Sequence, residues 1–371
     1  MKSIRFIITF IFTFLLIVDS NHLKGNEVAY TLKWQYDLDK KLIYVSNFSF
    51  IDNEVFFGSH EGLIFGLSLS SGNKKWEYQG KERYPAMNPI LKNEVIYFNS
   101  NNTLYAVNRK TKQIYWEYYK HKYGFISSPT ISGNSLFIGC KKGYVLSLYL
   151  KTGKINWITN LNSLVGVSKP VVDNESVYVS TNNGIYALDT KSGKILWKSQ
   201  LWKDKINPYD IEEPLILSDS IITWNKNYIY SIEKKDGKLK WSYNLPSAKY
   251  RNWDIHSMKI HSDSIIFAKR RYLYSVDKQK KDINWKFRAK GLITGVLITK
   301  KLILFGTSRS ESNRGYLYAL NISTGKEIWK YKAKSTEVTQ SLAIKNNTIV
   351  FSSRGDATTS PVTTVYALEI H

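Results

Sequence analysis

The residues that most often carry acid–base or metal chemistry are sparse in this chain, and their spacing does not suit it. His256 and His261 lie five positions apart, which does not match two metal ligands on one structural element. Motifs for phosphate binding, for a nucleophilic serine and for a zinc protease are absent. We therefore expect no catalytic residue, no cofactor and no metal site. The histidines are His22, His60, His121, His256, His261 and His371.

Carboxylate and thiol chemistry is equally poorly supported. Glu212 and Glu213, with Asp210 nearby, precede a predicted strand, and acid–base catalysis would need a second carboxylate converging from another part of the chain. The one cysteine, Cys140, ends the apolar run 136–140, where we expect a buried, unreactive thiol. A single cysteine also excludes an internal disulfide and any cysteine-based metal or haem motif.

A far stronger pattern is a small residue followed ten positions later by a tryptophan. Ala367 has no tryptophan after it, and Trp34 stands near the start without a small partner before it. Self-similarity at about 40–45 residues predicts a β-propeller, and the split repeat predicts that residues 30–36 complete its last blade. The complete pairs are Gly66/Trp76, Ala106/Trp116, Ser147/Trp157, Ala187/Trp197, Ser231/Trp241, Ser275/Trp285 and Ala319/Trp329.

Residues 165–201 show how one repeat builds a blade. Runs of alternating or apolar residues predict strands at 167–172, 176–180, 184–189 and 194–198, with an Asn-Asn-Gly hairpin between the second and third. Four antiparallel strands in about 40 residues form one propeller blade. Counting third strands, we predict an all-β, eight-bladed propeller of four-stranded antiparallel blades, with residues 26–371 as a single domain.

Position-specific residues in the repeat indicate structural roles. The turn before each tryptophan usually carries a glycine, for which we expect a positive φ, whereas Lys112 and Lys281 replace it in turns expected to be different or strained. We expect the small residue to leave room for an indole from a neighbouring blade, and the first strands to place their prolines at an unpaired edge facing the channel. The glycines are Gly72, Gly153, Gly193, Gly237 and Gly325; the prolines are Pro89, Pro129, Pro170 and Pro214.

The eight regularly spaced tryptophans are therefore predicted to hold blades together. Their regularity disfavours the alternative of a ligand-stacking platform, because a binding site would not recur in every blade. The set comprises Trp34, Trp76, Trp116, Trp157, Trp197, Trp241, Trp285 and Trp329.

The N-terminus indicates an exported protein, and the charge balance bears on its partners. Lys2 and Arg5 precede an apolar run, 6–18, that is shorter than the about 20 residues of a membrane span, so residues 1–25 are predicted to be a signal peptide. The alternative is an uncleaved signal that anchors the chain. The excess of 53 Lys+Arg over 30 Asp+Glu favours an acidic surface or anionic lipid, or else reflects lysine filling solvent-facing turns.

Loops joining second to third and fourth to first strands share one face of a propeller, and here they are rich in basic and aromatic residues. Exposed aromatic and arginine side chains make good interface anchors, so we predict a partner-binding face; the alternative is that these side chains pack over the channel mouth. The candidates are Arg83, Tyr84, Tyr123, Trp202, Lys203, Arg251, Trp253, Arg270 and Arg271.

Residues 187–197 (Ala-Leu-Asp-Thr-Lys-Ser-Gly-Lys-Ile-Leu-Trp) closely resemble the tryptophan-docking motif of PQQ-like propeller repeats, and residues 319–329 do so with Asn321 in place of the aspartate. The resemblance covers essentially residues 30–371. One branch of this family, the quinoprotein dehydrogenases, is larger and has a vicinal cysteine pair, which a single cysteine cannot form. The other branch is similar to BamB, a compact exported scaffold of outer-membrane β-barrel assembly. Such scaffolds typically carry a lipid-attachment cysteine, and this chain departs from them there.

The resemblance implies a non-catalytic scaffold, periplasmic and associated with the outer membrane, that acts as a monomer within a complex. Its expected partner is another envelope protein such as a β-barrel assembly component, and no nucleic acid is expected. The alternatives are a binding module for polyanions or cell-wall polymers, and a relative of the quinoprotein oxidoreductases.

Overall fold

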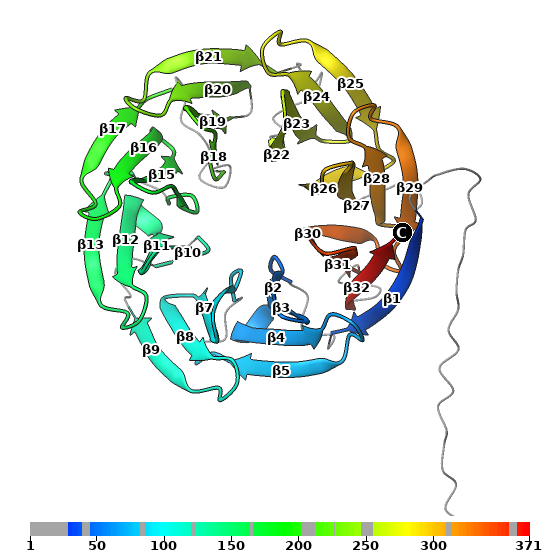
Figure 1. Ribbon diagram of the computed structural model, residues 1–371, viewed down its shortest axis with the longest axis horizontal. Helices are drawn as coiled ribbons and strands as arrows, with labels where there is room; N and C mark the ends of the chain where they lie inside the picture. Colours follow the sequence, from blue (N-terminus) through cyan, green and yellow to red (C-terminus); the bar gives the residue numbers. More distant parts are fainter. Residues whose placement is uncertain are drawn as a thin grey trace, which may run out of the picture.

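The computed structural model describes residues 29–38, 45–81, 86–119, 124–125, 127–163, 166–201, 212–225, 227–245, 255–308, 314–355 and 362–371. Over these residues the chain is a ring of β-sheets arranged around a central axis, with one strand of each sheet innermost and one at the rim (Figure 1). The predicted signal peptide, residues 1–25, lies outside the described residues.

Strands follow the chain outwards from the axis in each blade, and then the next blade begins. Blades 1 to 4 are β2 (Ser49–Ile51), β3 (Glu54–Gly58), β4 (Leu63–Ser68), β5 (Lys74–Gln79); β6 (Ile90–Lys92), β7 (Val95–Ser100), β8 (Thr103–Asn108), β9 (Ile114–Tyr119); β10 (Thr130–Ser132), β11 (Ser135–Gly139), β12 (Tyr144–Tyr149), β13 (Ile155–Asn160); and β14 (Val171–Val172), β15 (Ser176–Thr181), β16 (Gly184–Asp189), β17 (Ile195–Ser199). Short 3-10 turns, η1 (His60–Gly62) and η2 (Lys141–Gly143), link the second and third strands of blades 1 and 3.

Blades 5 to 8 repeat this order, except that the outermost strand of blade 8 comes from the start of the chain. They are β18 (Leu215–Ile216), β19 (Ser220–Trp224), β20 (Tyr228–Glu233), β21 (Leu239–Asn244); β22 (Ile255–His261), β23 (Ser264–Lys269), β24 (Tyr272–Asp277), β25 (Ile283–Arg288); β26 (Leu292–Ile298), β27 (Leu302–Ser308), β28 (Tyr316–Asn321), β29 (Glu327–Lys332); and β30 (Glu337–Lys345), β31 (Thr348–Arg354), β32 (Thr363–Ile370), β1 (Tyr30–Asp37).

Among the described residues, blades 1 to 6 are separate four-stranded sheets, whereas blades 7 and 8 together form one eight-stranded sheet. Only the pair Ser308 and Glu337 joins β27 to β30, so this sheet is two four-stranded units that touch at one edge. Every recorded strand pairing in blade 8 and its neighbours is antiparallel. The predicted fold class, an all-β propeller of four-stranded antiparallel blades, is confirmed.

The ring closes by joining the two ends of the chain. Strand β1 runs antiparallel to β32, with Trp34 opposite Ala367 and Tyr30 opposite Ile370, and the two lie side by side in Figure 1. Nearer the axis, the Ser341 hydroxyl of blade 8 donates to the Val45 carbonyl that precedes blade 1, at 2.9 Å. The prediction that residues 30–36 complete the last blade is therefore correct.

The core lies between blades and is built from the second and third strands. Register places Phe305 of β27 opposite Tyr318 of β28, and the two rings stack with centroids 5.0 Å apart. The pair Phe351 and Tyr366 in blade 8 repeats this arrangement at 4.9 Å. Burying such a side chain contributes about 1.5–3 kcal/mol. Phe305 and Tyr318 share one buried cluster with Ile266 and Leu273 of blade 6, so the pair also stabilises the packing of neighbouring sheets.

The prolines sit differently from the prediction. Pro89, Pro129, Pro170 and Pro214 each come immediately before the innermost strand of a blade, not within it. Their missing N–H therefore costs no ladder bond. The carbonyl group of Pro170 is used instead by a neighbouring blade, because the Thr130 hydroxyl donates to it at 2.6 Å.

Candidate functional site

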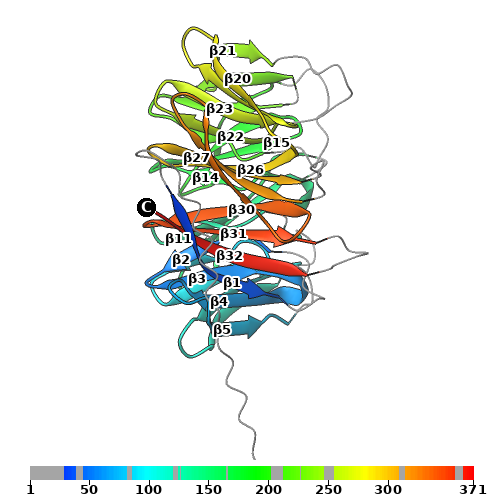
Figure 2. The ribbon, with the colours of Figure 1, turned by 90° about the vertical axis from the view of Figure 1, so that its right-hand side faces the viewer.

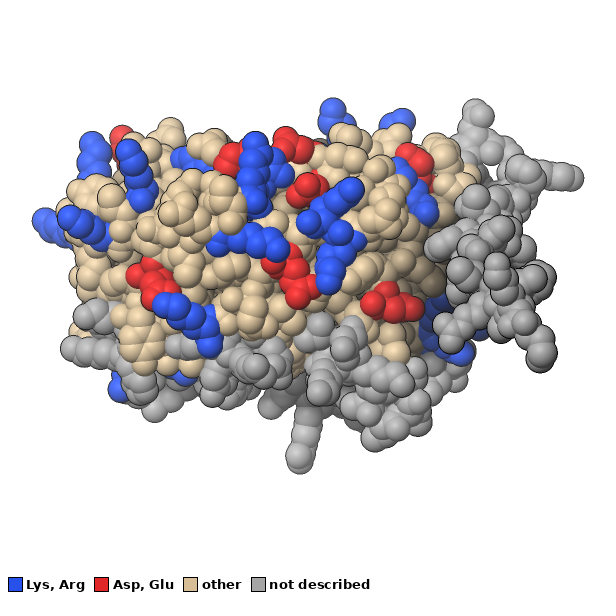
Figure 3. Space-filling view, turned by 90° about the horizontal axis from the view of Figure 1, so that it is seen from below, with Lys and Arg blue, Asp and Glu red and all other residues tan. Residues whose placement is uncertain are grey.

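The ring has two unlike faces. Connections from second to third strands and from one blade to the next lie on one face, here called the loop face. The turns from first to second and from third to fourth strands lie on the other face, here called the turn face (Figure 2). Lys and Arg side chains gather along the turn-face edge on the side seen in Figure 3, with acidic side chains among them.

The sequence predicts that the partner-binding residues lie on the loop face, and the structure describes two of them. Arg270 and Arg271 form the tight connection between β23 and β24, and Arg270 adopts a positive φ of 57°. The Arg270 carbonyl accepts the N–H of Ile293 at 2.7 Å, and the Arg271 carbonyl accepts that of Ala289 at 2.8 Å. The chain entering blade 7 therefore holds this arginine pair in place. The other candidates, Arg83, Tyr84, Tyr123, Trp202, Lys203, Arg251 and Trp253, lie outside the described residues.

Among the described residues, five of the eight repeat tryptophans link their blade to the next through the indole N–H. Trp34 Nε1 donates to the Leu69 carbonyl at 2.8 Å, from blade 8 to blade 1. Each acceptor lies three residues after the small residue of the next blade, so the bond recurs with the repeat. Within the described residues the other bonds of this kind are Trp116 to Leu150, Trp157 to Thr190, Trp197 to Lys234 and Trp285 to Ile322, at 2.9–3.2 Å.

The expectation for the small residues was wrong, and the turn glycines explain why. Ala187 lies directly opposite Trp197 of its own blade. The indole of the preceding blade instead covers the turn glycine: a Cβ on Gly193, where φ is +70°, would lie 2.5 Å from the Trp157 ring. Glycine is therefore needed both for the backbone conformation and for close approach of the neighbouring indole.

Lys112 and Lys281 keep the glycine conformation, with φ of 60° and 66°. The Lys281 ammonium lies 3.3 Å from the centroid of the Trp241 ring and donates to the Lys278 carbonyl, the position that accepts an indole N–H in five other blades. A lysine thus replaces the glycine-to-indole contact with a cation–π contact. Burial lowers the pKa of Lys281, and the negative charge of Asp277 partly offsets this by favouring the charged ammonium.

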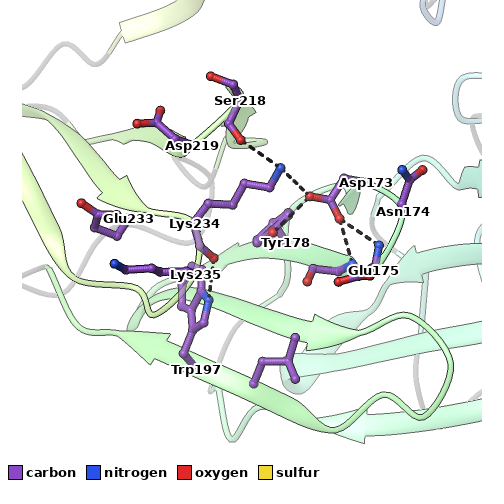
Figure 4. A pocket seen from close by; sticks show the side chains of 12 residues that line it. Asp173, Asn174, Glu175, Tyr178, Trp197, Ser218, Asp219, Glu233, Lys234 and Lys235 are labelled. Carbon is purple, nitrogen blue, oxygen red and sulfur yellow. Dashed lines mark hydrogen bonds and ion pairs between the residues drawn. The ribbon is translucent and has the colours of Figure 1, made fainter.

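A cavity of about 600 Å³ opens between blades 4 and 5 on the turn face (Figure 4). Asp173 is its central carboxylate. It accepts hydrogen bonds from the N–H groups of Ser176 at 2.9 Å and Glu175 at 3.1 Å, and from the Tyr178 hydroxyl at 3.2 Å. The Lys234 ammonium of blade 5 pairs with the same carboxylate at 2.8 Å.

These contacts keep Asp173 ionised and give it a structural role. Burial alone would raise its pKa, but hydrogen bonds from Lys234 and from two backbone N–H groups outweigh burial and lower the pKa. Burial raises the pKa of Tyr178 to about 12, so its hydroxyl stays protonated at neutral pH. Because Lys234 also supplies the carbonyl that accepts the Trp197 indole, the cluster joins blade 4 to blade 5 twice.

Sequence reasoning missed a second inter-blade ion cluster. Arg109 of blade 2 contacts Asp52 at 2.5 Å and Glu54 at 3.5 Å in blade 1, and Glu94 at 2.6 Å in its own blade. Its side chain is only 10% exposed. The Arg109 guanidinium lowers the pKa of Glu94. Asp52, Glu54 and Glu94 stand beside the turns between first and second strands, which the sequence shows. Their convergence on one arginine depends on how the two blades pack.

The remaining chemical candidates stay apart. Among the described residues, no group of three or more His, Cys, Asp and Glu could hold a metal ion. Cys140 is buried, and burial raises the pKa of its thiol. Glu213 pairs with Lys169 at 2.9 Å, while Asp210 lies outside the described residues. His261 ends β22, which also contains His256.

Comparison with known proteins adds a family match. The family model described as outer membrane protein assembly factor BamB matches residues 32–118 and 120–331. BamB of Legionella pneumophila (strain Paris) is 32% identical over 39% of this chain and 38% of its own length, so the chain spans less than half of that relative.

Two solved structures share the fold at low identity. The crystal structure of BamB from Moraxella catarrhalis has a TM-score of 0.67 at 16% identity, covering 91% of this chain and 97% of that chain. Quinohemoprotein alcohol dehydrogenase from Comamonas testosteroni has a TM-score of 0.72 at 13% identity, covering 92% and 76%.

Proposed function

Because this chain belongs to the family described as outer membrane protein assembly factor BamB, we propose that it is a non-catalytic envelope scaffold that binds another protein through its loop face. The proposed partner is a component of the machinery that assembles outer-membrane β-barrel proteins. The observation that carries the proposal is the family match over most of the ring, including the tryptophan repeats in blades 1 to 7.

The two ion clusters support a scaffold over an enzyme. Lys234 pairs with Asp173 across blades 4 and 5, and Arg109 pairs with Asp52 and Glu54 across blades 1 and 2. The other bonds of Asp173 and Arg109 are made within their own blades. A general base or a ligand clamp must keep part of its bonding capacity for a substrate. These charges instead stiffen the ring, which is what a rigid display of loops requires.

The loop face supports partner binding through its chemistry. Arg270 and Arg271 are held on it by backbone bonds from the next blade. The sequence predicts the remaining basic and aromatic candidates for the same face. Arginine and tryptophan are enriched among residues that dominate binding energy, so a few of them would carry most of the affinity.

Export is part of the proposal. We assign residues 1–25 as a signal peptide and residues 26–371 as one propeller domain, placed in the periplasm beside the outer membrane. Over the part of the chain that the structure describes, no helix has the length and apolar character needed to span a membrane.

The test is recovery of the partner from envelope extracts. The variant W202A/R251A/W253A should lose the partner in a pull-down, whereas Y115A/K326A, with substitutions on the turn side of the ring, should retain it. Both variants should keep the wild-type circular dichroism spectrum. Equal recovery by the two variants contradicts the proposed binding face.

A further inference from the structure

Exposed aliphatic side chains recur at one equivalent position on the outer rim of four consecutive blades. Ile155, Ile195, Leu239 and Ile283 each begin the outermost strand and lie opposite Leu148, Leu188, Ile232 and Val276 respectively. Their exposed fractions are 39%, 39%, 51% and 47%. Outside these four blades, the same position holds Lys74 in blade 1 and Glu327 in blade 7. It holds Ile114, which is partly buried, in blade 2 and Leu32, which is 39% exposed, in blade 8. Blades 3 to 6 therefore carry the one uninterrupted run of exposed aliphatic side chains at this position among the described residues.

The tryptophans differ along the same arc. Trp197, Trp241 and Trp285 of blades 4 to 6 are half-buried, whereas the five other repeat tryptophans are buried. Leu196, beside Trp197, is 50% exposed. The outer strands β13, β17, β21 and β25 that carry these residues follow one another along the rim in Figure 1. Blades 4 to 6 therefore present indole and aliphatic surface together.

Lysines flank this apolar surface in every blade of the arc. The turn preceding each of the four outer strands carries more lysine than acidic residues, over residues 149–155, 189–195, 233–239 and 277–283. In the part of the chain that the structure describes, the exposed lysines of these turns that make no ion pair are Lys151, Lys154, Lys191, Lys194, Lys235 and Lys280.

This combination matches an anionic membrane surface. Aliphatic and tryptophan side chains enter the boundary between headgroups and acyl chains, while neighbouring lysines contact anionic headgroups. Lysine is depleted in protein–protein interfaces, so free lysines beside every apolar residue argue against a protein partner here.

We propose that the rim of blades 3 to 6 at its turn-face edge, here called the basic rim, binds the surface of an anionic lipid bilayer. The basic rim is separate from the loop face. The ring would therefore rest against a membrane through one arc while its loops remain available to a protein partner.

The test is cosedimentation of the purified full chain with vesicles. The probes are vesicles of phosphatidylethanolamine with phosphatidylglycerol, and vesicles of phosphatidylcholine alone. We expect binding to the anionic vesicles only, weakening as salt rises because exposed charges are screened. Equal binding to both vesicle types, or none to the anionic ones, overturns the proposal.

Variants separate the apolar from the charged contribution. Replacing three apolar rim residues, L196S/L239S/I283S, should weaken binding to anionic vesicles about tenfold, and K154Q/K194Q/K235Q should lower binding and its salt dependence. The matched controls are L32S/Y115S/Y119S, which removes exposed apolar side chains from blades 8 and 2, and K290Q/K332Q/K334Q, at the loop-face ends of strands. All sites are exposed, so each variant should keep the wild-type urea midpoint. Equal effects of rim and control variants refute the basic rim.

The outcome also distinguishes this inference from the proposed scaffold role. Basic-rim variants should still recover the envelope partner, and W202A/R251A/W253A should still bind vesicles. If rim variants lose a protein partner while vesicle binding is unchanged, the rim is a protein interface and the lipid proposal is wrong.

Discussion

Trp34 lies opposite Ala367 across β1 and β32, so a residue near the start of the chain completes the sheet formed by its end. The Trp34 indole then donates to the Leu69 carbonyl of blade 1 at 2.8 Å. One residue thus closes blade 8 and fastens it to blade 1. The stability of the whole ring should depend on this junction.

Replacing Trp34 with alanine should lower the free energy of unfolding by about 3–5 kcal/mol. The side chain is buried, and its removal leaves a cavity and the Leu69 carbonyl without its donor. Urea denaturation followed by circular dichroism measures the loss. The control, Leu32→Ala in the same strand, removes a side chain that is 39% exposed and should cost less than about 1 kcal/mol. Equal losses of unfolding free energy for the two variants would contradict the special role of Trp34 at the closure of the ring.

Two glycines with positive φ should respond differently to alanine. Gly193→Ala should destabilise the protein by about 3 kcal/mol, because the new Cβ meets the Trp157 ring in addition to the strained backbone. Gly133 has φ of +54° but nothing within 4 Å of a Cβ, so Gly133→Ala should cost only about 1 kcal/mol. Thermal and urea unfolding compare the pair. The docking account fails if the two costs are the same.

The Arg109 cluster predicts a pH dependence of stability. Its guanidinium lowers the folded-state pKa of Glu94 below the ordinary value of 4.5, so the stabilisation is present above that value and is lost as pH falls through the folded pKa. Arg109→Met should therefore unfold at lower urea than wild type at pH 7, and the gap should narrow below about pH 4.5. A gap that stays constant from pH 7 to pH 3 would contradict this assignment.

Cys140 should be chemically silent in the folded protein. Its side chain is fully buried, and burial raises the pKa of the thiol, so the reactive thiolate is scarce at neutral pH. A disulfide reagent such as dithionitrobenzoate should react fully after denaturation and negligibly before it. Rapid labelling of the native chain would show that Cys140 is accessible.

The sequence predicted most of the ring because each repeat carries its own local signals. Strands at 176–180 and 184–189 were expected and are observed at Ser176–Thr181 and Gly184–Asp189, since alternation and the Asn-Asn-Gly turn determine them locally. The closure by Trp34 was also predictable, because a split repeat implies a partner at the other end of the chain.

Contacts between blades were harder to predict. The partner of Trp157 proved to be a turn glycine of the next blade, and Arg109 proved to gather carboxylates from two blades. Both contacts depend on how two sheets pack, and the spacing of residues within one repeat does not predict that packing. The half-exposed rim tryptophans were indistinguishable from the buried ones for the same reason. The predicted roles of Trp202 and Trp253 remain predictions, because these residues lie outside the described residues.

The central claim, a scaffold that binds an envelope partner through its loop face, is tested most directly by photo-cross-linking in intact cells. A photoreactive amino acid would replace Trp202 or Trp253, which are predicted to lie on the loop face, and Tyr115 on the turn side as the comparison. The account predicts that the loop-face positions cross-link to a component of β-barrel assembly and that Tyr115 does not. It is contradicted if loop-face probes capture no envelope protein, or if all three positions give the same products.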